Sequence, residues 1–455
     1  MAHTTVLGQS HLRPETFVKT GEVEHVFRRV TLRLIPLLAF VFILACIDRT
    51  NIGFAKLSMS SDLNFSEAVY GLGAGIFFIG YFLFEVPSNL LMVKIGARKT
   101  LARITILWGI TSICMMYVST PLSFYIVRFL LGVCEAGFYP GVILYLTYWF
   151  PASRRAKATG LFMISIPLAS VIGGPIAGAI MKQMVGVGSL DNWQWLFLIE
   201  GIPSIIAGIF LLFFLPEKPD SVKWLSAREK SLIHDELAMD GGDTEPKHAS
   251  FRLALSSKRL WICAGIFFCL VAGNATLVFW VPSIIYEMGV HDALNIGLLS
   301  VIPSLAGTLA MILNSSHSDK TGERRLHCAL AALLAALGLI LTGVFVDSGV
   351  IAMITLTMAA IGVLGAMPIF WSFPSAFLSG TAAAGGIALI NCLANLAGFV
   401  APYAIGSLKV LTGSVASGLY FVAGLEITAA IVVLALFGKA RHQKNETLGN
   451  RAALE

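Results

Sequence analysis

Twelve long apolar stretches follow one another along the chain, and they restrict its fold more than any other feature. Each holds roughly 20 mainly apolar residues, the length that a helix needs to cross the hydrocarbon core of a membrane. Only 13% of the residues are charged, about half of the share in soluble domains. Because a bilayer offers backbone groups no hydrogen-bond partner, the pattern predicts an all-α membrane protein. The predicted spans are residues 31–53, 69–93, 100–118, 123–148, 158–181, 193–215, 260–286, 294–313, 326–346, 350–370, 384–407 and 417–437.

The basic residues are distributed unevenly between the two sides of these spans. Of 32 Lys and Arg residues, 27 lie in the two termini and in the connections that follow even-numbered spans. Only Lys56, Lys182 and Lys409 lie on the other side, and Arg49 and Arg128 lie within spans. Basic residues favour the cytoplasmic side of membrane proteins. The distribution therefore predicts a multi-pass protein of the cell inner membrane with both termini in the cytoplasm.

The sequence also contains an internal repeat. Residues 94–99 and 320–325 match at an offset of 226, and the same offset places the first span over the seventh. Two related groups of six spans are typical of carriers whose binding site lies between the halves near the midplane of the membrane. We therefore expect two six-helix bundles joined by a cytoplasmic linker, with a short surface helix near residues 226–239. The expected parts are a tail at 1–30, a bundle at 31–216, the linker at 217–258, a second bundle at 259–438 and a tail at 439–455.

Several motifs resemble a known family. The segment 315–325, with the pattern S-x-x-x-D-K-x-G-x-R-R, resembles the signature loop of the major facilitator superfamily, in which Asp319 and Arg324 are expected to form a conformational latch. Its first copy has Asn89 and Val93 where Gly and Asp are usual. Other motifs resemble the anion:cation symporters of that superfamily, and they are DRTNIGFA at 48–55, GY at 80–81, EVPSN at 85–89, RFLLGVCEAGF at 128–138 and WQWLFLIEG at 193–201. The resemblance implies the two-bundle fold, alternating access and proton-coupled transport of carboxylates such as tartrate, galactonate, rhamnonate, phthalate or 4-hydroxyphenylacetate.

Ionisable residues inside the spans are the candidate functional residues, since they are costly in a membrane and usually serve function. They are Asp48, Arg49, Glu85, Arg128, Glu135, Glu200 and Glu426. Arg128 and Glu135 are seven residues apart and share one helix face. A guanidinium can bind both oxygens of a carboxylate, and a desolvated carboxylic acid can bind and release a proton. Asp48 and Arg128 are expected at similar depth, where pairing would lower the cost of both, and we expect Asp48 to be tied to Arg49 or Arg128.

The resemblance implies that Asp48 and Glu135 bind protons and that Arg49 and Arg128 control substrate binding and coupling. A static cluster of ion pairs that holds the helices together is the alternative. Glu85 precedes Pro87 and is expected to stabilise a kinked span, Glu200 is expected to be structural, and Glu426 has no evident partner. Further candidate substrate ligands are Tyr81, Asn274, Trp371, Asn391 and Asn395, for which ordinary helix packing is an equal alternative.

Other classes of membrane protein fit the sequence less well. All nine histidines lie in tails, in connections or at a span edge, so haem or metal chemistry within the bundle has no support. Channels use rings of like groups or carbonyl filters, often from several subunits. We expect a monomeric carrier in lipid, without enzymatic activity, metal, cofactor or nucleic-acid partner, that uses protons as the coupling ion. Its substrate is a hydroxycarboxylate, such as tartrate or a sugar acid, or an aromatic carboxylate. Anion exchange or uniport also stays open.

Overall fold

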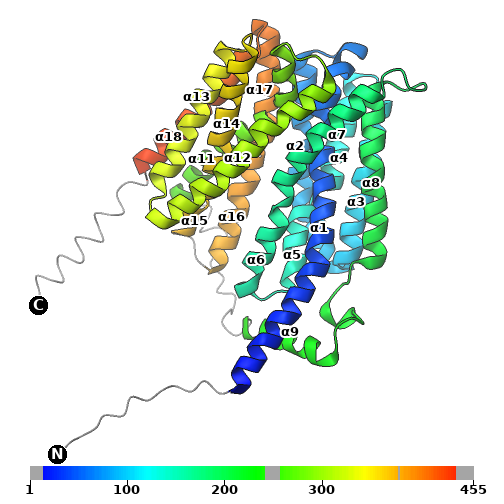
Figure 1. Ribbon diagram of the computed structural model, residues 1–455, viewed down its shortest axis with the longest axis vertical. Helices are drawn as coiled ribbons and strands as arrows, with labels where there is room; N and C mark the ends of the chain where they lie inside the picture. Colours follow the sequence, from blue (N-terminus) through cyan, green and yellow to red (C-terminus); the bar gives the residue numbers. More distant parts are fainter. Residues whose placement is uncertain (1–13, 241–256, 378–379, 437–455) are drawn as a thin grey trace, which may run out of the picture.

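The computed structural model describes residues 14–240, 257–377 and 380–436, and these residues contain helices and no strand (Figure 1). Twelve helical segments are long and apolar enough to cross a membrane, which confirms the predicted count. The adjacent spans at 326–346 and 350–370 are separate helices. The first half comprises α1 (Pro14–Asp62), α2 (Glu67–Ile95), α3 (Ala97–Cys114), α4 (Pro121–Glu135), α5 (Phe138–Thr147), α6 (Ala152–Met163), α7 (Ser165–Gln183) and α8 (Asn192–Phe214). The second half comprises α11 (Lys258–Glu287), α12 (Ala293–Thr321), α13 (Arg325–Val344), α14 (Gly349–Phe370), α15 (Ser372–Ser375), α16 (Gly380–Asn395), α17 (Ala397–Thr412) and α18 (Ala416–Leu436).

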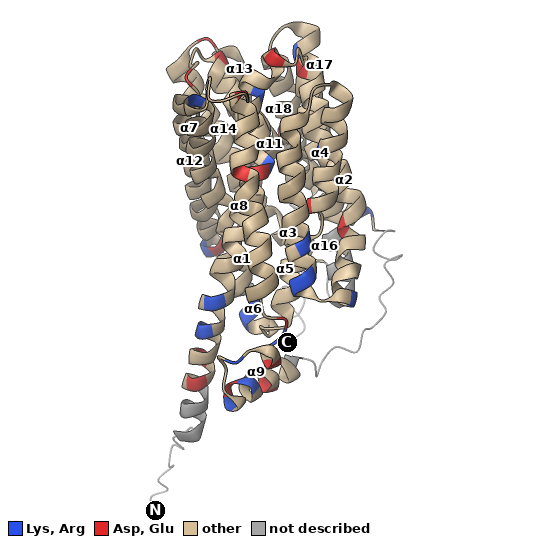
Figure 2. Ribbon diagram, turned by 90° about the vertical axis from the view of Figure 1, so that its right-hand side faces the viewer, with Lys and Arg blue, Asp and Glu red and all other residues tan. Residues whose placement is uncertain are grey.

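The segment between the halves contains the predicted surface helix, α9 (Ala227–Asp240). It lies beside the first part of α1, where Arg29 pairs with Glu229 and Arg228 pairs with Glu22 at 2.6 Å. Helix α1 is continuous from Pro14, so the described part of the expected N-terminal tail is helical. The expected C-terminal tail and residues 241–256 of the linker lie outside the described residues. Lys and Arg gather at the end of the molecule that carries α9, which we call the basic end (Figure 2).

The two copies of the repeated loop are stabilised by different contacts. In the second copy Asp319 pairs with Arg324, as expected for the signature loop. At the degenerate first copy, the carboxylate of Glu217 accepts hydrogen bonds from the backbone N–H groups of Ala97 at 2.5 Å and Arg98 at 3.2 Å. A carboxylate there is favourable because the N-terminus of α3 carries free N–H groups and a partial positive charge. The residue that follows the sixth span thus caps the third.

The two halves interlock at the end opposite the basic end. An added Cβ at Gly71 of α2 would lie 2.4 Å from the carbonyl oxygen of Pro402 on α17. At Gly297 of α12 it would lie 2.3 Å from the carbonyl oxygen of Gly174 on α7. Such short approaches require glycine, because any side chain would force the backbones apart. The halves are therefore closed against each other at this end, which we call the closed end.

Replacing Gly297 by alanine is expected to weaken this closure, because the new Cβ would collide with the backbone of α7. Spin labels can be placed on the exposed residues Ser119 and Leu411, which lie at the closed end in different halves. Weaker closure is expected to increase the distance between the two labels. Gly265 is the matched control, since an added Cβ there meets no atom within 4 Å. An unchanged distance in Gly297→Ala would show that the closed end adapts without opening.

Candidate functional site

The fourth span is interrupted beside one of the candidate acids. Helix α4 ends at Glu135, and α5 begins at Phe138 after Gly137, whose φ of 90° is in the left-handed region. An added Cβ at Gly137 would lie 2.7 Å from the side chain of Ser88 on α2, so both the conformation and the close approach require glycine. Broken spans place free backbone groups at the binding sites of many carriers. The break marks the level of the candidate site.

Arg49 of α1 and Glu135 of α4 form an ion pair at this level. The Glu135 side chain is 2% exposed and the Arg49 side chain is 25% exposed, so the pair is accessible only from the arginine. Two atoms lack a partner among the described residues, namely Nε of Arg49 and Oε2 of Glu135. The pair therefore keeps one free donor and one free acceptor in a nearly water-free position.

Arg128 lies on α4 and is completely buried. Its Nε donates to the carbonyl oxygen of Gly73 at 3.1 Å, and its Nη2 donates to that of Ala74 at 3.3 Å. Nη1 has no partner in the described part of the chain. The carbonyl groups hold the guanidinium in place and leave its positive charge without a carboxylate, so the site retains an uncompensated cation.

An aromatic ring connects the two arginines. The guanidinium carbons of Arg49 and Arg128 each lie 5.2 Å from the ring centre of Phe77 on α2, and that of Arg49 lies 5.5 Å from the ring of Tyr81. Guanidinium groups are attracted to aromatic faces within about 6 Å. Four candidates, Arg49, Tyr81, Arg128 and Glu135, thus lie in one cluster, to which the structure adds Phe77.

Asp48 lies outside this cluster, and its expected pairing with Arg49 or Arg128 is wrong. Its carboxylate accepts hydrogen bonds from Trp108 Nε1 at 3.0 Å, Ser112 Oγ at 3.0 Å and Ser204 Oγ at 2.6 Å. Consecutive residues of a helix point about 100° apart, so Asp48 faces α3 and α8 while Arg49 faces α4. Asp48 is 1% exposed, and neutral donors replace the expected cation.

Two further buried acids occupy equivalent positions in the halves. Glu200 on α8 and Glu426 on α18 are 226 residues apart, the offset of the repeat. Neither carboxyl group has a hydrogen-bond partner among the described residues. Glu200 lies near Asp48, whereas Glu426 packs where an added Cβ on Gly273 of α11 would be 2.1 Å from its Oε1. Each acid thus rests against the first span of its own half.

The candidates of the second half supply polar groups without charge. Asn274 lies on α11, and Asn391 and Asn395 lie on the neighbouring α16. All three are half-buried and make no side-chain hydrogen bond in the described structure. Trp371 packs edge-on against Phe267, with ring centres 4.8 Å apart. The amide groups of Asn274, Asn391 and Asn395 therefore keep free hydrogen-bonding capacity.

Glu85 of α2 lies one turn from Tyr81, toward the basic end. Its side chain makes no hydrogen bond with another described residue, and its backbone carbonyl accepts from Asn89 Nδ2 at 2.9 Å. The expected support of a kinked span by Glu85 stays a prediction.

Sequence reasoning missed a network of charges at the closed end. Lys409 of α17 donates to Glu67 of α2 at 2.7 Å and to Glu287 of α11 at 2.5 Å, while Lys56 of α1 pairs with Glu67 at 2.6 Å. Lys56 also donates to Ser283 Oγ of α11 at 3.0 Å. The scarcity of basic residues on this side was the available signal. Three lysines were predicted there, and each forms an ion pair.

The third of these lysines forms a more exposed pair. Lys182, in the last turn of α7, pairs with Asp292 at 2.7 Å, and their side chains are 50% and 33% exposed. The hydrogen bond from Lys182 lowers the pKa of the Asp292 carboxyl, which lies between two spans. This pair joins the halves in the same way as Lys409 but in contact with solvent.

The described residues contain no group of three or more His, Cys, Asp or Glu side chains that could hold a metal ion.

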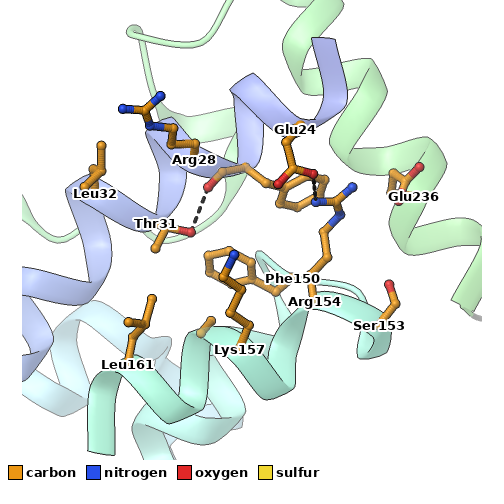
Figure 3. Close-up of a pocket in the computed structure, with 12 residues that line it drawn as sticks. Glu24, Arg28, Thr31, Leu32, Phe150, Ser153, Arg154, Lys157, Leu161 and Glu236 are labelled. Carbon is orange, nitrogen blue, oxygen red and sulfur yellow. Dashed lines mark hydrogen bonds and ion pairs between the residues drawn. The ribbon is translucent and has the colours of Figure 1, made fainter. Parts of the chain in front are cut away.

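A pocket of about 660 Å³ lies at the basic end, between α1, α6 and α9, and away from the arginine cluster (Figure 3).

Comparisons with known proteins agree with this architecture. The family model of the Major Facilitator Superfamily matches residues 38–402. An Agrobacterium vitis protein named "Putative tartrate transporter" is 48% identical over 415 residues, covering 90% of this chain and 94% of the relative. A "Quinolone resistance transporter" of Acinetobacter baumannii is 40% identical over 424 residues, which cover 93% of this chain and 97% of that relative. Among solved structures, the chain resembles a bacterial homologue of the human lysosomal transporter Spinster in an inward-facing and unoccupied conformation. The TM-score is 0.69 at 15% identity, and the match covers 91% of this chain and 95% of that chain.

Proposed function

The chain belongs to the major facilitator superfamily and is a membrane transporter rather than an enzyme, and we propose that it couples the movement of protons to that of a small organic anion by alternating access. The observation that carries this proposal is the pair of arginines around Phe77. Arg49 and Arg128 each present an unpartnered N–H group inside the membrane, and Arg128 forms no ion pair with a described carboxylate, although a cation without a counter-ion is costly there. An anionic substrate would supply the missing charge.

The orientation follows from the basic residues. We place the basic end in the cytoplasm, because basic residues favour that side, and both termini with it. The closed end then faces the periplasm, so that the described conformation is inward-facing. In this state the substrate site communicates with the cytoplasm, and the charge network of Lys56, Glu67, Glu287 and Lys409 separates it from the periplasm.

The proton-binding residue of this mechanism is Glu135. In the absence of substrate, Arg49 neutralises Glu135. A substrate carboxylate that binds Arg49 through two oxygens competes with Glu135 for the guanidinium. The released Glu135 then takes up a proton, because an unpaired buried carboxylate is unfavourable. Loss of the substrate to the cytoplasm returns Arg49 to Glu135 and expels the proton. Substrate and proton thereby bind together and leave together.

Asp48 is the second acid of the proposal, with a different environment. Its three neutral donors stabilise the carboxylate without a cation, and Arg49 is not among them. Substrate binding at Arg49 would therefore not release Asp48 directly. We assign the substrate-dependent proton to Glu135 and a substrate-independent one to Asp48.

The preferred substrate is a hydroxycarboxylate such as tartrate or a sugar acid. Two guanidinium groups suit carboxylate oxygens, and the amides of Asn274, Asn391 and Asn395 suit hydroxyl groups. The relative named for tartrate supports this class. The second candidate is an aromatic carboxylate, which the rings of Phe77 and Tyr81 favour.

Uptake into liposomes tests the function. Purified protein is expected to accumulate tartrate when the outside is more acidic than the inside, and to lose this accumulation when a protonophore removes the gradient. Uptake of a labelled aromatic carboxylate in the same preparation compares the two substrate classes. Saturable uptake that ignores the pH gradient would contradict coupling to protons and support uniport or exchange.

Arg49→Lys is expected to weaken substrate binding about 10- to 100-fold, since lysine keeps the charge and loses the two-point geometry. Calorimetry on purified protein measures the dissociation constant. Arg98→Lys, in the first turn of α3, is the matched control and should retain wild-type affinity. Equal affinities for Arg49→Lys and wild type would show that Arg49 does not bind the substrate carboxylate.

A further inference from the structure

The pocket at the basic end has a regular arrangement of charged and apolar side chains. It holds about 660 Å³ between α1, α6 and α9, a size typical of small-molecule sites. Figure 3 shows Lys157 directed into the space between α1 and α6, with Arg28 at the rim on α1. The pocket is distant from the arginine cluster, so the proposed transport mechanism does not use it.

The two main helices of this pocket repeat one pattern. On α1, Arg28 is followed four residues later by Leu32, and on α6, Lys157 is followed four residues later by Leu161. Residues four apart share a helix face. Both helices run from the basic end into the membrane, so each leucine lies roughly 6 Å deeper than its cation. Leu32 is 62% exposed and Leu161 is 39% exposed.

The cations of this pattern are available for a ligand. Arg154 lines the same pocket but pairs with Glu24 at 2.8 Å and stacks on Phe27. Arg28 and Lys157, by contrast, are exposed and make no ion pair or side-chain hydrogen bond with other described residues. Two free cations thus line this pocket, and each lies one helical turn from an exposed leucine that also lines it.

We propose that this pocket binds an anionic phospholipid. The phosphate lies between Arg28 and Lys157, and the acyl chains follow Leu32 and Leu161 into the membrane. Basic pockets between membrane helices at the cytoplasmic side bind anionic headgroups in this way. The exposed leucines favour a lipid over a free phosphate, because a soluble anion would leave this apolar surface uncovered. Glu236 of α9 also lines the pocket, so a bound lipid would contact the segment that connects the halves.

The test measures lipid binding to the full-length protein in detergent. Native mass spectrometry counts adducts with phosphatidylglycerol, phosphatidylcholine and soluble glycerol 3-phosphate at equal concentrations. Wild type is expected to retain phosphatidylglycerol in preference to both. The double variant Arg28→Gln/Lys157→Gln is expected to lose about 25-fold in apparent affinity for phosphatidylglycerol, since each cation near an anionic lipid contributes about a factor of five.

A matched variant separates this site from general attraction to a basic surface. Lys94→Gln/Lys99→Gln removes the same charge from two exposed residues of the basic end, and should bind like wild type. Equal losses in the two double variants would overturn the site, as would equal retention of the two lipids by wild type. Binding of glycerol 3-phosphate as strong as that of the lipid would overturn the role of Leu32 and Leu161. The readout is independent of transport, so it stands or fails separately from the proposed function.

Discussion

Glu135→Gln is expected to retain exchange of substrate across the membrane and to lose accumulation driven by a pH gradient. Glutamine resembles the protonated acid in shape and charge, so the loaded carrier can reorient. It cannot release a proton to the cytoplasm, and substrate movement then no longer depends on the gradient. For one proton per substrate, each pH unit supports about a tenfold accumulation ratio. This ratio should fall to about one in the variant, while counterflow of labelled substrate continues.

Glu85→Gln is the matched control for this experiment. Glu85 also lies within a span, on α2 beside the cluster, and is close enough to Arg49 to interact with its charge, but Arg49 forms its ion pair with Glu135. Accumulation in Glu85→Gln should resemble that of wild type. If Glu135→Gln accumulated substrate fully, Glu135 would not be the coupling residue, and its ion pair with Arg49 would be structural. If counterflow also stopped, the Arg49–Glu135 pair would be needed for binding itself.

Lys409→Gln is expected to shift the protein from the described conformation toward one that is open at the closed end. The ammonium of Lys409 binds Glu67 in the first half and Glu287 in the second. Its loss leaves Glu287 without a cation among the described residues, while Glu67 keeps Lys56. Hydrogen bonds to charged groups contribute about 1.5–3 kcal/mol. Because Lys409 is 19% exposed, solvent reduces this value to about 1–2 kcal/mol, a 5- to 30-fold shift.

Lys182→Gln provides the matched control, since its pair with Asp292 joins the same halves but is exposed. Exposed pairs contribute little to stability, so Lys182→Gln should leave the equilibrium nearly unchanged. Spin labels on Ser119 and Leu411 measure both variants in the same background. A shift of similar size in both would mean that net charge at this end controls closure. No shift in Lys409→Gln would mean that the glycine contacts between the halves suffice.

Much of the fold follows from local properties of the sequence. The length and polarity of each apolar stretch predict a span regardless of its neighbours, and all twelve are present. The offset of 226 likewise predicts two equivalent halves, and in the structure Glu200 and Glu426, 226 residues apart, each lie against the first span of their own half. The ionisable residues within the spans also stand out without a structure, because the cost of charge in a membrane makes them rare.

The partners of these residues depend on how each helix is rotated and which helix lies beside it. Sequence reasoning paired Asp48 with Arg128 by depth, yet Asp48 faces Ser204 on α8, and Glu135 pairs with Arg49. Depth along a helix can be counted from the sequence at 1.5 Å per residue. The direction of a side chain around the axis has meaning only relative to neighbouring helices, and packing between distant spans sets it.

The charge network of the closed end likewise has features that the sequence predicts and features that depend on packing. Sequence alone located Lys56, Lys182 and Lys409 on one side of the membrane. Their acidic partners come from other helices, and Glu67 and Lys409 are 342 residues apart. Glycine contacts between α2 and α17, and between α7 and α12, bring these helices together. The sequence by itself therefore determined which charges are present and at which depth, whereas the tertiary structure decided which of them meet, since only packing brings residues from distant helices within bonding distance.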